Sequence, residues 1–161
     1  MKKALLVSSL VMALVLAAAS AAFALTSTVT VTATVPGVFH LTVSQPTVAF
    51  GNLTEAELTA GKTVASATDV QVVSNRVYTL SNATSDFADA GTNVMPADAL
   101  SYSWTGSTTG SGVASNSAQN ITNVGARGNT DYNMSYTLTP TLQVEPASYT
   151  GVVTYTAIQN P

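Results

Sequence analysis

The alternation of apolar and polar positions is most regular over residues 27–35, which read S-T-V-T-V-T-A-T-V. Successive side chains of a β-strand point to opposite faces, so this segment predicts a half-buried strand. Its polar face would consist of threonines, and its apolar face of Val29, Val31, Ala33 and Val35. Such a strand could pair within its own domain or with a neighbouring molecule, and the pattern leaves both open.

Shorter alternating runs follow along the chain and are separated by Pro, Gly and Asn at intervals of about ten residues. Strands are expected at residues 38–43, 48–50, 62–74, 77–81, 100–104, 121–124, 130–139 and 149–158. No window shows a sustained helical period, although residues 53–61 could form one helical turn or a polar connection. The pattern predicts an all-β chain, a single immunoglobulin-like β-sandwich, with a jelly roll or an open barrel as alternatives.

Composition predicts the character of the segments between these strands. Residues 75–76 look like a hairpin turn, and residues 82–98 look like a loop. Residues 105–120 are rich in Gly, Ser, Thr and Asn, which favours a mobile polar excursion.

The first 24 residues have the organisation of a secretory signal peptide. Two lysines precede an apolar run, and Ala22-Phe23-Ala24 supplies a small-x-small site, so cleavage is expected after Ala24. The alternative is an uncleaved anchor, but the run is short against the roughly 20 residues that span a bilayer. The expected organisation is a signal peptide at 1–24, an N-terminal strand at 25–36 as a candidate donor strand, and a β-sandwich at 37–161. Secretion to the cell surface or the medium follows, with no membrane span after cleavage.

Charge narrows the range of partners. Without the signal peptide, three basic residues face eight acidic ones, which excludes the basic face that nucleic acid or anionic lipid requires. The charged fraction is only 8%, which suits a protein that packs against copies of itself or against a wall. The chain has no cysteine, so it cannot contain disulfides or thiolate metal sites.

Candidate chemistry is sparse, and neither catalysis nor a cofactor is expected. His40 is the only histidine and lies on a predicted polar face, and no G-x-S-x-G elbow accompanies it. Asp86, Asp89 and Asp98 fall in one predicted loop and are weak candidates for a calcium site, since Ca²⁺ takes several oxygen ligands. Acidic residues of a secreted loop are more often simply solvated.

Tyr102 and Trp104 lie on one face of a predicted strand and could form an aromatic platform for a glycan. Core packing is the favoured interpretation, because large aromatic residues dominate the cores of sandwiches.

The end of the chain, P-A-S-Y-T-G-V-V-T-Y-T at residues 146–156, resembles the last strand of many secreted bacterial β-sandwiches. V-A-F-G at residues 48–51 resembles a motif near their beginning. These proteins include fimbrial subunits, spore-coat-U-like proteins and WxL-type wall-binding domains. The chain lacks a W-x-L motif, to which residues 103–105 come nearest, and it lacks the cysteines common in pilus subunits. The resemblance implies a structural or adhesive role at the cell surface and carries over no catalytic residue.

The sequence leads to two hypotheses, which assign the protein to different functional classes. The first is a structural subunit that polymerises into a pilus-like filament or surface layer, with residues 27–35 inserted into the sheet of the next copy. The alternative is a monomeric module that binds cell-wall or host glycans through residues 105–120 and the nearby aromatic rings.

Overall fold

The computed structural model describes residues 28–161, so the predicted signal peptide and its cleavage site lie outside the described residues. The chain divides into two units, Met1–Val35 and Pro36–Pro161. Residues 28–38 contain no helix or strand, and the side chains of Val29 and Val31 are both 85% exposed. Among residues 28–161, no helix combines the length and the apolar character needed to cross a bilayer.

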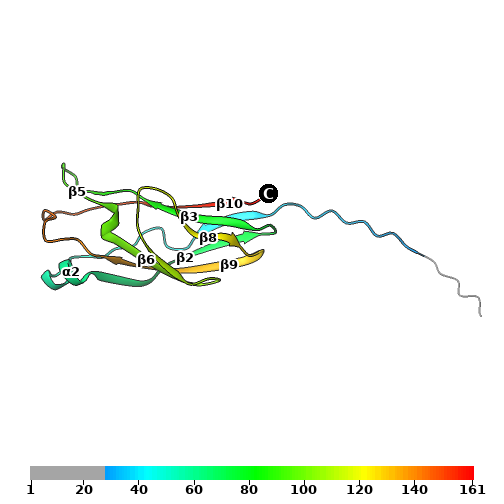
Figure 1. The fold of residues 1–161 in the computed structure, drawn as a ribbon, viewed down its shortest axis with the longest axis horizontal. Coiled ribbons are helices and arrows are strands. Elements are labelled where there is room, and N and C mark those ends of the chain that lie inside the picture. The colour runs from blue at the N-terminus through cyan, green and yellow to red at the C-terminus, as the bar shows by residue number, and fades with distance from the viewer. Residues whose placement is uncertain (1–27) are drawn as a thin grey trace, which may run out of the picture. The chain divides into compact units, whose positions relative to one another are not determined.

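The second unit is an antiparallel β-sandwich, as the sequence predicts (Figure 1). The larger sheet has the order β1-β2-β9-β6-β7, with β1 (Phe39–Val43), β2 (Lys62–Ser74), β9 (Gly128–Leu138), β6 (Leu100–Gly106) and β7 (Gly110–Val113). The smaller sheet has the order β10-β3-β8, with β10 (Val153–Gln159), β3 (Tyr78–Thr84) and β8 (Gln119–Gly125).

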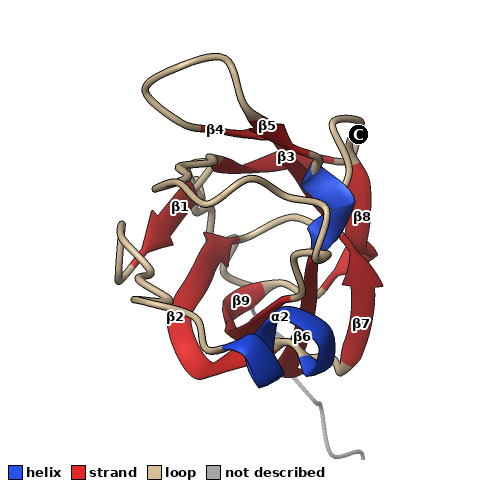
Figure 2. Cartoon of the chain, turned by 90° about the vertical axis from the view of Figure 1, so that its left-hand side faces the viewer, coloured by secondary structure: helices blue, strands red, loops and turns tan. Residues whose placement is uncertain are grey.

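One end of the sandwich carries the small elements (Figure 2). The hairpin of β4 (Phe87–Ala88) and β5 (Val94–Met95) lies on one side of this end, and helix α2 (Glu55–Ala60) lies on the other. Helix α2 begins with a capping box, in which the Thr54 hydroxyl accepts from the Glu57 N–H and the Glu57 carboxylate accepts from the Thr54 N–H. A single 3₁₀ turn, η1 (Ala97–Ala99), leads into β6.

The core follows from the alternation within the interior strands. Strand β9 lies between β2 and β6, and its inward-facing residues from Thr130 to Leu138 are buried at every second position. The opposite positions carry Asn, Ser, Thr and Asp and face outward. Residues from both sheets fill the space between them, including Val70, Val72, Tyr78, Leu80, Tyr102, Trp104, Tyr132, Met134 and Tyr136.

Four expectations from the sequence are wrong. Residues 82–98 are not a loop throughout, because they contain the end of β3, the β4–β5 hairpin and the start of η1. Residues 48–50 form no strand, although Val48 and Phe50 pack against the core. Residues 75–76 do not close a hairpin, because β2 and β3 belong to different sheets and the chain crosses between them there. Residues 105–120 are no simple excursion, because they contain β7 and the start of β8.

Candidate functional site

The two sheets meet at two lateral borders, and the border between β7 and β8 is closed. Two glycines of β7 lie beneath aromatic rings of β6, Gly110 beneath Trp104 and Gly112 beneath Tyr102. Farther along this border Ala114 and Ile121 are buried. Because the glycines of β7 have no side chains, the large rings of β6 can pack over this edge strand and cover this side of the core.

The opposite border, between β1 and β10, differs in how well its core-facing side chains are covered and not in its free edges, because β7 and β8 also pair with only one neighbour each in the part of the chain that the structure describes. Within residues 28–161, each of these strands pairs with only one neighbour, β1 with β2 and β10 with β3. Their second edges carry no ladder. We call these two unpaired edges and their inward-facing side chains the open seam, which comprises Phe39, Leu41, Val43, Val153, Tyr155 and Ala157.

The exposure of these residues shows that the core is incompletely covered at the open seam. On β1, Leu41 and Val43 remain 36% and 37% exposed, whereas their ladder partners Val72 and Val70 are fully buried. On β10, Tyr155 and Ala157 are only partly buried, whereas their partners on β3 are buried. Apolar side chains therefore stay in contact with water at the two edges that also lack main-chain partners.

Two polar contacts fix the strands on either side of the open seam. The Gln159 side-chain amide donates to the Val38 carbonyl and to the Ser74 hydroxyl, each at 3.3 Å, and so joins the end of β10 to the start of β1. The Tyr155 hydroxyl bonds that of Tyr136 on β9. Burial raises the pKa of both tyrosines above the ordinary value, so both hydroxyls stay protonated well into the alkaline range.

The backbone just before β1 is held by Asn75, which follows β2. The Asn75 side-chain amide donates to the Pro36 carbonyl at 2.7 Å, and its carbonyl oxygen accepts from the Val38 N–H at 3.1 Å. The Asn75 backbone N–H also donates to the Val38 carbonyl at 3.2 Å. One side chain thus binds the main chain on both sides of Gly37.

The aromatic residues proposed for glycan contact belong to the core. Tyr102 and Trp104 are 5% and 8% exposed and stack with ring centroids 5.9 Å apart. The Trp104 indole N–H donates to the Thr108 hydroxyl. Core packing is therefore the interpretation that the structure supports, and neither ring offers a face to a glycan.

The three aspartates considered for calcium do not converge. Asp86 accepts from the Ala97 N–H, and Asp89 accepts from the backbone of Gly91 and from Asn93. Asp98 is exposed within the 3₁₀ turn η1. Among the described residues, no three His, Cys, Asp or Glu side chains come together, and the Asp86 and Asp89 carboxylates accept hydrogen bonds from loop residues. His40 lies on the exposed face of β1.

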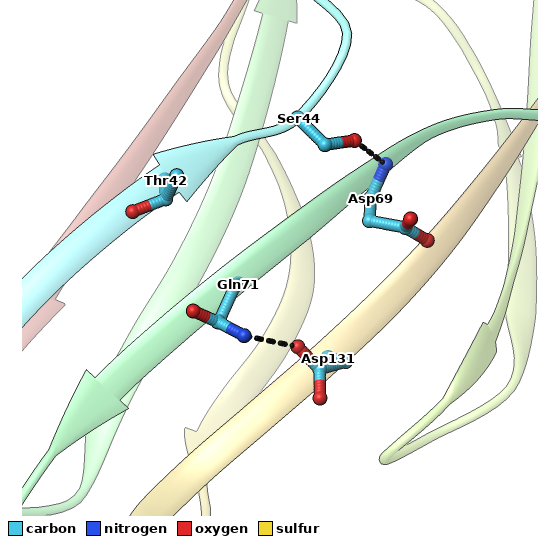
Figure 3. A pocket seen from close by; sticks show the side chains of 5 residues that line it. All are labelled: Thr42, Ser44, Asp69, Gln71 and Asp131. Atoms are coloured by element: carbon cyan, nitrogen blue, oxygen red, sulfur yellow. Dashed lines mark hydrogen bonds between the residues drawn. The ribbon is translucent and has the colours of Figure 1, made fainter.

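A shallow hollow of about 400 Å³ lies on the outer face of the larger sheet (Figure 3). Except for Thr42, its polar side chains already bond other side chains or the backbone. The Gln71 amide donates to the Asp131 carboxylate at 2.9 Å, and the Ser44 hydroxyl accepts from the Asp69 N–H at 2.9 Å (Figure 3). The Asp69 carboxylate accepts from the Asn133 side-chain amide at 2.7 Å, so both carboxylates of the hollow are partnered and the hollow is a polar surface feature.

Sequence reasoning missed Tyr155, Gln159 and Asn75 as residues of the site. Tyr155 could have been found, because T-Y-T-A-I-Q alternates and places the tyrosine with the apolar set. Nothing in the sequence indicates the role of Asn75, since an asparagine between two strands is typical of any turn.

No protein-family model matches the sequence, and no curated protein matches it significantly. Among solved structures, the chain is similar to the P pilus rod subunit PapA, with a TM-score of 0.41 and 15% sequence identity. The match covers 83% of this chain and 99% of that one. A likeness this distant assigns no function, which has to be argued from the open seam itself.

Proposed function

We propose that this chain is an extracellular structural subunit that assembles head to tail into a filament or surface layer. Residues 28–35 of one copy would add as a strand between β1 and β10 of the next. The observation that carries the proposal is the open seam, where two unpaired edges border partly exposed apolar side chains. The same chain supplies an unpaired segment with the alternation that such a site requires.

Strand addition fits the chemistry of both parts. An added strand gains main-chain hydrogen bonds from each free edge, while alternate side chains enter the core. The apolar set of residues 28–35 would cover the seam, and its threonines would face outward beside Thr42 of β1 and Thr154 and Thr156 of β10. Unpaired edges otherwise favour uncontrolled pairing, so a dedicated occupant also protects the subunit.

Side-chain volumes favour one register. If the added strand runs antiparallel to β10 with Ala33 opposite Tyr155, then Val31 lies opposite Ala157 and Val35 opposite Val153. The smallest residue of the segment then meets the largest residue of β10. Small residues facing large ones pack without voids or overlap, as protein interiors require.

The mode of contact determines the kind of assembly. The segment and the seam are different surfaces of one chain, so each copy can donate to one neighbour and accept from another. A contact between unlike surfaces that does not close into a ring propagates as a fibre. This relation makes a filament the expected product.

The test is negative-stain electron microscopy of residues 25–161 beside a chain that lacks residues 25–35. We expect filaments from the longer chain and discrete particles from the shorter one. A synthetic peptide of residues 25–35 should raise the unfolding temperature of the shorter chain, because a ligand that binds only the folded state stabilises it. Discrete particles from both chains, with no effect of the peptide, would contradict the proposal. Retention of those particles on insoluble polysaccharide would then favour a monomeric glycan-binding module.

A further inference from the structure

The N-terminal segment faces a competition between its own open seam and that of another copy. A strand tethered to its own site has an effective concentration in the millimolar range, far above the concentration of neighbouring copies. Intramolecular pairing would therefore prevail unless the connection prevented it. Within the proposed assembly, we infer that Pro36 and Gly37, held by Asn75, direct this strand to a second copy of the chain.

The connection between the segment and β1 is too short for a relaxed return. For residues 28–35 to lie beside β1 of the same chain, the chain would have to reverse at Pro36-Gly37. Two-residue hairpin loops use type I′ or II′ turns, and both need a positive φ at the first central residue. Proline fixes φ near −65°, so Pro36 cannot take that position in either turn.

The next longer loop is also disfavoured. A three-residue hairpin loop begins with two residues in the right-handed helical region and ends with a residue in the left-handed region. For a loop of residues 35–37, Val35 would need the helical conformation, which the following proline disfavours. For a loop of residues 36–38, the left-handed residue would be Val38. A β-branched residue rarely adopts that conformation. In the structure neither Gly37 nor Val38 has a positive φ, so the segment holds neither of these two short-loop geometries.

Asn75 adds a second barrier, because it fixes the backbone that would have to turn. Its side chain bonds the Pro36 carbonyl and the Val38 N–H, and the Val38 carbonyl accepts from both the Asn75 N–H and Gln159. Reversal at Gly37 would break the two side-chain bonds. The occupant of the seam is thereby specified as residues 28–35 of a second copy, a segment of eight residues that matches the seven of β10.

Two substitutions remove the two barriers separately. Pro36→Asn creates the Asn-Gly dipeptide that favours a type I′ turn, and Asn75→Ala removes both side-chain bonds. Pro46→Asn, in another loop, and Asn133→Ala, which loses an amide bond to Asp69, serve as matched controls. Each protein, as residues 25–161, is assayed for filament yield and for hydrogen exchange of residues 29–35 in the monomer fraction.

We expect the Pro36→Asn/Asn75→Ala double variant to yield at least tenfold fewer filaments, with slow exchange at residues 29–35 in its monomers. Wild type and both controls should assemble, with fast exchange at these residues in any remaining monomer. Pro36→Asn alone should also lower the filament yield and slow the exchange at residues 29–35. This single variant keeps the test valid if Asn75→Ala impairs folding.

The failures of this inference and of the proposed function are distinguishable. Wild-type-like filament yield and fast monomer exchange in both Pro36→Asn and the double variant would overturn the inference and leave strand addition intact. Slow exchange at residues 29–35 in wild-type monomers would overturn it as well. Wild-type protein that forms no filament, with no effect of deleting residues 25–35, would overturn the proposed function itself.

Discussion

The hydroxyls of Tyr136 and Tyr155 form a hydrogen bond that joins β9 of one sheet to β10 of the other, beside the open seam. Tyr155→Phe removes one partner and leaves the buried Tyr136 hydroxyl without its bond. We expect a loss of about 1–2 kcal/mol in the free energy of unfolding, measured by urea denaturation.

Tyr149→Phe is the matched control for this prediction. The Tyr149 hydroxyl donates to the Glu145 carbonyl at 2.8 Å in an exposed loop, where water can replace it. Its unfolding free energy should stay within about 0.5 kcal/mol of wild type. Equal decreases in the unfolding free energy of the two variants would show that the hydrogen bond between the sheets stabilises the fold no more than the exposed one does.

Buried tyrosines predict that stability falls at alkaline pH. Burial raises the pKa of Tyr132, Tyr136 and Tyr155 in the folded chain above the ordinary value of 10.0. Their stabilising contribution is complete below about pH 10 and is lost as the pH rises, because the unfolded chain releases these protons first. Above that pH, each tyrosine lowers the free energy of unfolding by up to about 1.4 kcal/mol per pH unit. Urea denaturation between pH 8 and pH 11.5 checks this, and Tyr155→Phe should show a shallower decline.

The closed border predicts a strict requirement for glycine at position 110. A Cβ atom there would lie 2.7 Å from Cη2 of the buried Trp104 ring, which has no room to withdraw. Gly110→Ala should therefore lower the free energy of unfolding by about 1–3 kcal/mol, measured by chemical denaturation. Gly37 has no atom within 4 Å of an added Cβ, so Gly37→Ala should leave the stability of the sandwich nearly unchanged.

The proposed strand addition predicts an alternating sensitivity in the N-terminal segment. Val31→Asp would place a charge in the seam and forfeit roughly 1.5–3 kcal/mol of apolar burial, which raises the concentration needed for assembly about 10- to 100-fold. Thr32→Asp changes the outward face and should raise the concentration needed for assembly far less. Light scattering measured against protein concentration gives this threshold for each variant. Equal effects of the two variants would argue against a strand with one buried face.

Alternation was sufficient to predict the interior strands. Residues 62–74 form β2 with the bounds expected from the sequence, and β9 and β6 carry their apolar residues inward as predicted. In these strands each side chain points either to the core or to solvent, so the alternation of apolar and polar residues in the sequence matches the alternation of buried and exposed positions.

The remaining errors arise where neighbours outside the segment decide the structure. Strand β7 is Gly-Ser-Gly-Val, which has weak strand propensity, and the rings of Trp104 and Tyr102 pack over its glycines. The crossing at residues 75–76 looks like a hairpin turn locally, yet the partners of β2 are β1 and the distant β9, and not β3. The open seam depends on which strands remain unpaired, a property of the topology that no short window contains.

The contrast between the two borders of the sandwich limits the architecture that strand addition can build. At the border between β7 and β8, aromatic rings pack over glycines, so in the proposed assembly each molecule would offer one apolar seam, between β1 and β10, to a foreign strand. Each chain would have one N-terminal segment to give. Every copy then has a valence of two, one donating and one accepting. Growth with that valence is linear, and branch points or lateral sheets would require a second kind of contact.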